Sequence, residues 1–91
     1  MPINAVSFKV DQSSLVQDLK VAREKLDGAD GELVLDFSTV HRIDPAALKI
    51  MEELAGAAEG KSVKIVLYGL SVDVYKAFKL GKLAGRFNYL N

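Results

Sequence analysis

Three short apolar segments, each followed by a segment with helical periodicity, constrain most strongly how this chain can fold. The apolar segments are residues 5–10, 32–37 and 63–68. The first alternates apolar and polar side chains, as a half-buried strand near a sheet edge does. The second holds Leu33, Val34 and Leu35 in succession, which is typical of a strand covered on both faces. Strands separated by helices predict an α/β domain with a mostly parallel β-sheet and right-handed crossovers.

The first helix is predicted to begin at Ser13 or Ser14 and to end near Gly28. Ser14 and Gln17 have the spacing of a capping box, in which each side chain bonds to the backbone of the other residue. Apolar residues then recur at helical spacing and form one stripe, which comprises Leu15, Leu19, Ala22 and Leu26. Such a stripe predicts a helix that packs one face against the sheet.

Asp44 and Pro45 predict the start of the second helix, because aspartate caps a helix and proline suits its first position. This helix is expected to run to about Glu59, with Gly60 as its C-cap. Its apolar arc comprises Ala47, Leu48, Ile50, Met51, Leu54, Ala55 and Ala58. The breadth of this arc predicts a helix that is well buried along one side.

The third helix is predicted to be capped by Ser71 and to end at Gly81. Leu70 and Tyr75 have the spacing of a hydrophobic staple around its start. Three side chains are expected to face the core, namely Val74, Tyr75 and Phe78. The tail, residues 83–91, holds Phe87, Tyr89 and Leu90. Three large apolar side chains predict that this tail packs back onto the domain.

Length and composition limit the kinds of chemistry that this chain can perform. Its 91 residues suffice for one domain, residues 1–91, and its 49% hydrophobic and 26% charged residues are ordinary globular values. It has no cysteine and one histidine, which excludes disulfides and thiolate metal sites. No nucleotide-binding loop or nucleophile elbow occurs. The expectation is a protein that is not an enzyme and needs no cofactor or metal. A small catalytic or metal site built from Asp36, His41 and Asp44 is the alternative.

The formal net charge of zero hides an uneven distribution along the chain. Residues 1–60 carry six basic and eleven acidic residues, whereas residues 61–91 carry six basic residues and Asp73 alone. The basic third is either a solvated surface or a contact for nucleic acid, an anionic lipid or an acidic partner. Residues 3–10 and the helices show no basic-aromatic interleaving of the kind that stacks bases, so no nucleic-acid partner is expected. No apolar run is long enough to insert into a membrane, and residues 1–4 lack signal-peptide features, so we expect a cytoplasmic protein.

Residues 33–48, LVLDFSTVHRIDPAAL, resemble the signature of STAS domains, which occur in sulfate transporters and anti-sigma-factor antagonists. In that family an apolar strand ends in Asp-Leu-Ser, and after four variable residues Ile/Val-Asp-Ser-Ser/Thr-Gly-Leu opens a helix. Asp36 and Ser38 match the first part of this pattern, and the second part is matched by Ile43, Asp44 and Leu48. Residues 63–71 resemble the third strand of the family and its Gly-Leu-Ser helix entry. The resemblance covers residues 32–85 and implies a STAS-like fold.

The resemblance also shows where this chain departs from the family. Switchable members are phosphorylated by a kinase-type anti-sigma factor on a Ser or Thr just after the aspartate. Pro45 and Ala46 occupy these degenerate phosphoacceptor positions, and neither has a hydroxyl group. Ala47 stands where the family usually has glycine, and a single strand replaces the N-terminal β-hairpin of many members. The resemblance therefore implies a protein-binding module that is not switched by phosphorylation at this loop.

The resemblance places the expected contact surface at the start of the second helix. Its predicted partner-binding residues are His41, Asp44, Pro45, Ala46, Lys49 and Ile50. The implied partner is a kinase-type anti-sigma factor. Alternatively, small stand-alone STAS proteins serve as cytoplasmic subunits that bind the ATPase of phospholipid-trafficking ABC transporters, and Val40, Arg42 and the Val74-Tyr75 pair resemble that branch. The sequence is compatible with a homodimer as well as with a monomer.

Overall fold

The computed structural model describes residues 4–90, so residues 1–3 and Asn91, the last residue of the predicted tail, lie outside it. The elements follow one another in the order β1 (Asn4–Asp11), the 3-10 turn η1 (Gln12–Ser14), α1 (Leu15–Leu26), β2 (Gly31–Thr39), α2 (Pro45–Lys61), β3 (Lys64–Tyr68), α3 (Val72–Leu80), the 3-10 turn η2 (Ala84–Arg86) and β4 (Asn88–Leu90). The three predicted strands and three predicted helices are all present. A fourth strand, β4, completes the sheet.

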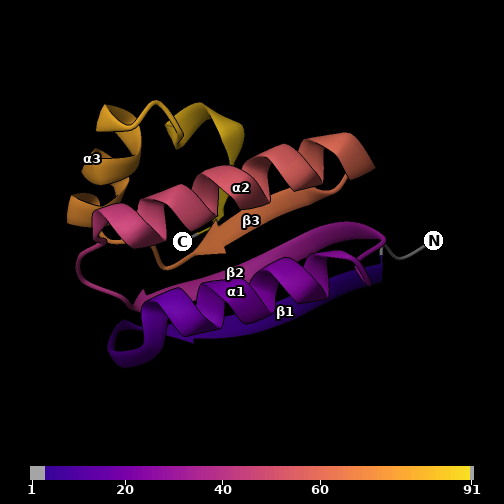
Figure 1. Ribbon diagram of the computed structural model, residues 1–91, viewed down its shortest axis with the longest axis horizontal. Helices are drawn as coiled ribbons and strands as arrows, with labels where there is room; N and C mark the ends of the chain where they lie inside the picture. Colours follow the sequence, from indigo (N-terminus) through magenta and orange to yellow (C-terminus); the bar gives the residue numbers. More distant parts are fainter. Residues whose placement is uncertain (1–3, 91) are drawn as a thin grey trace.

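The four strands form one sheet in the order β1-β2-β3-β4, and every neighbouring pair is parallel. The predicted parallel α/β architecture is therefore confirmed, with β1 at an edge. Figure 1 shows α1 and α2 side by side across the sheet, whereas α3 lies apart, beside the start of α2. Because all strands are parallel, their carboxyl ends lie along a common edge, where β2 passes into α2 and β3 passes into α3.

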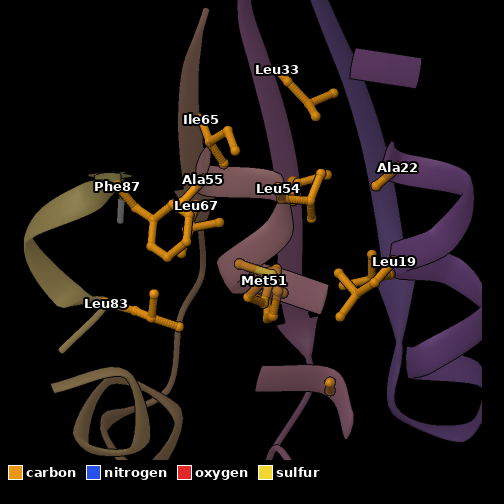
Figure 2. Packing of buried hydrophobic residues seen from close by; sticks show 14 of the residues in the cluster. Leu19, Ala22, Leu33, Met51, Leu54, Ala55, Ile65, Leu67, Leu83 and Phe87 are labelled. Carbon is orange, nitrogen blue, oxygen red and sulfur yellow. The ribbon is translucent and has the colours of Figure 1, made fainter. Parts of the chain in front are cut away.

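The core lies between the sheet and the two long helices. The predicted stripe of α1 is buried in full, and α2 buries its inner residues Ala47, Met51, Leu54, Ala55 and Ala58. Figure 2 shows Leu19 and Ala22 of α1 beside Met51 and Leu54 of α2, with Leu33 of β2 in the same cluster. Burial in β2 alternates, with Leu33, Leu35 and Phe37 fully buried and the residues between them only partly so. The expectation that this strand is covered on both faces is therefore wrong.

Two helix ends differ from the sequence-based expectation. Ser14 precedes α1, but its side chain does not cap the helix; its Oγ donates instead to Asp18 Oδ2 at 2.8 Å. The same Asp18 oxygen accepts the Asp11 backbone N–H at 2.9 Å, so Asp18 replaces the predicted Ser14–Gln17 capping box. The second helix passes through Gly60 and ends at Lys61, followed by Ser62 in the left-handed region with φ 56°. Ser62 thus takes the capping position that was expected of Gly60.

The third helix and the tail account for the remaining differences. The Ser71 hydroxyl accepts from Val74 N at 3.2 Å, and Gly81 follows the last turn, as predicted. Val74 and Phe78 are buried, but Tyr75 is exposed, and its ring meets Tyr89 edge-on at 5.6 Å between centroids. The tail packs back as expected. Beyond η2 it pairs with β3 as β4, an element that the predicted order lacks.

Candidate functional site

The six predicted partner-binding residues lie together at the carboxyl edge of the sheet, in the loop after β2 and the first turns of α2. We call these residues the docking surface: His41, Asp44, Pro45, Ala46, Lys49 and Ile50. Five of the six side chains are exposed, and Ile50 is half-buried against the core. Ala47, between them in the sequence, is fully buried and anchors the start of the helix. The segment thus presents small and basic side chains to solvent on a firmly packed helix.

Asp44 fixes the start of α2. Its backbone is extended, its Oδ1 accepts the Ala47 N–H at 2.8 Å, and its carbonyl accepts the Leu48 N–H at 2.9 Å. Pro45 occupies the first helical position, where its missing N–H leaves no bond unmade. The Asp44 side chain also lies at the positive end of the helix dipole, where an acidic residue stabilises a helix. The predicted capping role of Asp44 is confirmed by this geometry.

A residue that the sequence did not single out holds the loop on its other side. The Gln12 side chain, in η1, accepts the backbone N–H groups of His41 at 2.6 Å and Arg42 at 3.0 Å through Oε1. Its Nε2 donates to the Arg42 carbonyl at 3.1 Å. Gln12 therefore satisfies three backbone groups of a loop some thirty residues further along the chain. No local pattern around Gln12 signals this contact.

Replacing Gln12 by alanine is expected to lower the free energy of unfolding by about 1 kcal/mol, because three exposed or half-buried hydrogen bonds are lost. The 41–42 loop would also become more mobile, which chemical-shift and relaxation measurements on the His41 and Arg42 amides would report. Gln12→Glu keeps an acceptor for both N–H groups but cannot donate to the Arg42 carbonyl, so it should fall between the alanine variant and the parent chain. Equal amide mobility in all three proteins would contradict this role.

Two polar hollows flank the docking surface. One, of about 250 Å³, is lined by residues 12–17 together with Asp44, and the other, of about 470 Å³, is lined by Gln12, Arg42, Ile43 and Asp44. Gln12 and Asp44 line both hollows. A partner that contacts the start of α2 would find hydrogen-bonding side chains on either side of it.

Asp36 and Ser38, which match the first part of the family pattern, form a local turn near the end of β2. Asp36 Oδ1 accepts the Ser38 backbone N–H at 2.8 Å. Hydrogen bonds from Ser38 lower the pKa of the Asp36 carboxyl, which stays ionised at neutral pH. Ser38 also contacts Gly69, the first residue after β3, where a Cβ would lie 3.0 Å from Ser38 Cβ. The ends of β2 and β3 are therefore drawn close together.

Asp36, His41 and Asp44, the residues of the alternative catalytic or metal site, do not form a group that could hold a metal ion. Asp36 and Asp44 each direct an oxygen to a nearby backbone amide. Within residues 4–90, no three His, Asp or Glu side chains are grouped so that they could hold a metal ion. Over the same residues, no helix has both the length and the apolar character needed to cross a membrane.

Solved structures from two bacteria share this fold. The Thermotoga maritima protein TM1081, solved by NMR, has a TM-score of 0.78 and 12% identity, with 100% of this chain and 77% of that chain covered. Its crystal structure, described as that of a candidate anti-sigma factor antagonist, has a TM-score of 0.71 and 16% identity, with 100% and 75% covered. A sulfate transporter family protein of Wolinella succinogenes has a TM-score of 0.77 and 16% identity, with 98% and 79% covered.

At these identities the likeness concerns the fold. No curated protein matches the sequence. The model of the STAS domain, however, matches residues 4–90, which include every strand and helix described above and the whole docking surface. The resemblance that residues 33–48 carry thus extends over nearly the entire chain, and the chain belongs to the STAS domain family.

Proposed function

We propose that this chain is a non-enzymatic interaction module that binds a kinase-type anti-sigma factor through the docking surface. STAS domains generally interact with other proteins, and the structural neighbours include a candidate anti-sigma factor antagonist. The observation that carries the proposal is the exposed and firmly held start of α2. His41, Pro45 and Ala46 are open to solvent, although Asp44 and Gln12 fix the backbone around them.

The fixed backbone favours binding for an entropic reason. Association costs free energy whenever a loop must be ordered in the interface. Here the loop is already ordered by the Gln12 hydrogen bonds, and Pro45 restricts the first helical residue. Small side chains at Pro45 and Ala46 let a partner approach the helix closely, and Lys49 one turn further on suits an acidic group on that partner.

The same segment cannot be switched in the usual way of its family. A phosphate adds about −1.5 to −2 charges and strong acceptor oxygens at a helix start. Pro45 and Ala46 offer no hydroxyl group to carry it. We therefore propose that binding is constitutive at this surface and is regulated by the amounts of the two proteins.

A second candidate partner is the ATPase of a phospholipid-trafficking ABC transporter, with this chain as its cytoplasmic accessory subunit. The fold likeness to a sulfate transporter family protein supports a transporter context. The Val74-Tyr75 pair of the resembling branch lies on α3, where Tyr75 is exposed and available for contact. Both candidates use protein contact, so one experiment separates them.

Affinity purification of the tagged protein from its native cells, followed by mass spectrometry, tests the proposal. An anti-sigma kinase or sigma regulator should be recovered with the parent chain, and its recovery should fall at least tenfold with Ala46→Arg or Lys49→Glu. Lys20→Glu is the matched control, because it makes the same charge change at an exposed position on α1. Recovery of an ABC ATPase would establish the transporter candidate instead. A partner retained equally by all variants would show that the docking surface is wrong.

Incubation with a kinase-type anti-sigma factor and ATP tests the phosphorylation part separately. The parent chain should gain no phosphate mass, whereas Pro45→Ser should gain one phosphate because it restores a hydroxyl next to Asp44. Pro45 and Ala46 of the parent chain cannot carry a phosphate. If the parent chain gained a phosphate at another position, constitutive binding would be contradicted.

A further inference from the structure

The exposed large hydrophobic residues of the described chain all gather at one end of the molecule. They lie at the carboxyl end of β3, on α3 and on β4: Tyr68, Val72, Tyr75, Leu80, Tyr89 and Leu90. Leu80 is 86% exposed and Val72 is 69% exposed, so both project from the outer side of α3. Single exposed apolar residues are normal, but a group of this kind marks an interaction surface.

Lysines surround these apolar side chains. Lys76, Lys79 and Lys82 are exposed, and none of them takes part in the ion pairs found among residues 4–90. Asp73 is the only acidic residue in the last third of the chain. Three of the six basic residues of the last third are therefore concentrated, in space, beside an apolar group. The other three lie elsewhere, since Lys61 and Arg86 pair with Asp27 and Glu59 and Lys64 begins β3.

The arrangement on α3 follows helical spacing. Val74 and Phe78 face the core, so the outer side is shared by the exposed Val72, Asp73, Lys76, Lys79 and Leu80, with Tyr75 at its flank. Lys76, Lys79, Leu80 and Lys82 line an open hollow of about 460 Å³. A second hollow of about 350 Å³ lies between the start of α3 and β4, and its walls include Val72, Tyr75 and Tyr89. We call the outer side of α3 together with these hollows the α3 face.

We propose that the α3 face binds the surface of an anionic lipid bilayer, without crossing it. Leu80 and Val72 would enter the boundary between headgroups and acyl chains, and the tyrosine rings would lie at headgroup depth. The three lysines would reach the anionic headgroups with their ammonium groups while their alkyl stems cover apolar surface. This inference is independent of the anti-sigma factor proposed for the docking surface, because it uses different residues; it shares only Tyr75 with the ABC ATPase candidate.

The composition of the α3 face favours a bilayer over a second copy of the chain. An interface in which two copies place the same face together would bring six lysines close to one another, with only Asp73 from each copy to offset them. Composition also argues against a protein partner here, since lysine is depleted in protein interfaces whereas arginine is enriched. The ion pairs of Arg23 and Arg86 are made within the chain, and neither residue belongs to the α3 face.

Co-sedimentation with vesicles tests the proposal directly. The protein should sediment with vesicles of phosphatidylglycerol and phosphatidylcholine at low salt, should be released by high salt, and should not bind vesicles of phosphatidylcholine alone. Lys76→Gln combined with Lys79→Gln should lower the partition coefficient about thirtyfold, at about fivefold for each lysine. Leu80→Ser should lower it about tenfold. Leu80 is almost fully exposed, so this variant should keep the unfolding midpoint of the parent chain.

Lys20→Gln combined with Lys64→Gln is the matched control, because it removes the same charge from exposed positions on α1 and at the far end of β3. It should bind nearly as well as the parent chain. An equal loss in both double variants would overturn the proposal, since the effect would then follow net charge alone. Equal binding to neutral vesicles, release by inorganic phosphate at constant ionic strength, or a stable dimer with no vesicle binding would overturn it as well.

Discussion

Replacing Phe78 by alanine is expected to lower the free energy of unfolding by about 3–5 kcal/mol. Phe78 is fully buried and joins three parts of the chain: its ring lies edge-on to Phe37 of β2 at 6.3 Å and beside Phe87 of the tail at 5.6 Å. Removing it leaves a cavity under α3 and loosens the tail at the same time. A domain of this size is stable by about 5–15 kcal/mol, so the loss is a large fraction of the total.

Urea unfolding of Phe78→Ala and of Leu80→Ala compares the free energies of unfolding of a buried and an exposed substitution on the same helix. Leu80 is 86% exposed, so its truncation should change stability by no more than about 0.5 kcal/mol. Both variants substitute alanine within α3, so differences in helix propensity are small. If Leu80→Ala were the more destabilising of the two, the packing of α3 described here would be wrong.

The second large effect is expected at Gly69, where alanine should cost about 2–4 kcal/mol. Gly69 has φ +69°, a left-handed conformation that side chains disfavour, and a Cβ would lie 3.0 Å from Ser38 Cβ and 3.2 Å from Ser38 Cα. Its backbone N–H also donates to the Leu90 carbonyl at 3.1 Å, so a shift away from Ser38 would disturb β4. The atoms that the new Cβ would meet are the backbone and Cβ of Ser38, which cannot move away by a side-chain rotation.

Gly60→Ala is the matched control for this prediction. Gly60 lies within α2, and a Cβ there has no neighbouring atom within 4 Å. Alanine is favoured over glycine in a helix interior by about 0.5–1 kcal/mol, so this variant should be more stable than the parent chain. Thermal or urea unfolding should therefore move in opposite directions for the two substitutions. A shift of the same sign in both would contradict the close approach of β2 and β3 at Gly69.

Much of the fold could be predicted because its signals are local. The stripe of Leu15, Leu19 and Ala22 needs only helical spacing, and the Asp44-Pro45 start of α2 needs only two adjacent residues. β4 gave no such signal: its three residues are all exposed, so they show no burial pattern, and each pairs with a β3 residue twenty-two positions earlier. Tyr75 was expected to face the core with Val74 and Phe78, yet it is 41% exposed and packs against Tyr89.

The candidate site shows the same division between local and distant contacts. The sequence predicted the cap at Asp44, because it joins residues only three positions apart. It did not predict the Gln12 contacts with His41 and Arg42, which depend on how η1 is placed relative to β2. It also could not show that the exposed apolar residues and the lysines of the last third meet on one surface.

The short strand β4 also affects the chain's resistance to aggregation. β3 carries Ile65, Val66 and Leu67 in succession, all buried, and β4 covers the edge of that strand. An apolar strand with an uncovered edge is a template for pairing with another molecule. Strands this short and exposed open locally at a lower free energy than the whole domain. The rate at which β4 detaches, rather than global unfolding, would then limit how long the protein survives at high concentration.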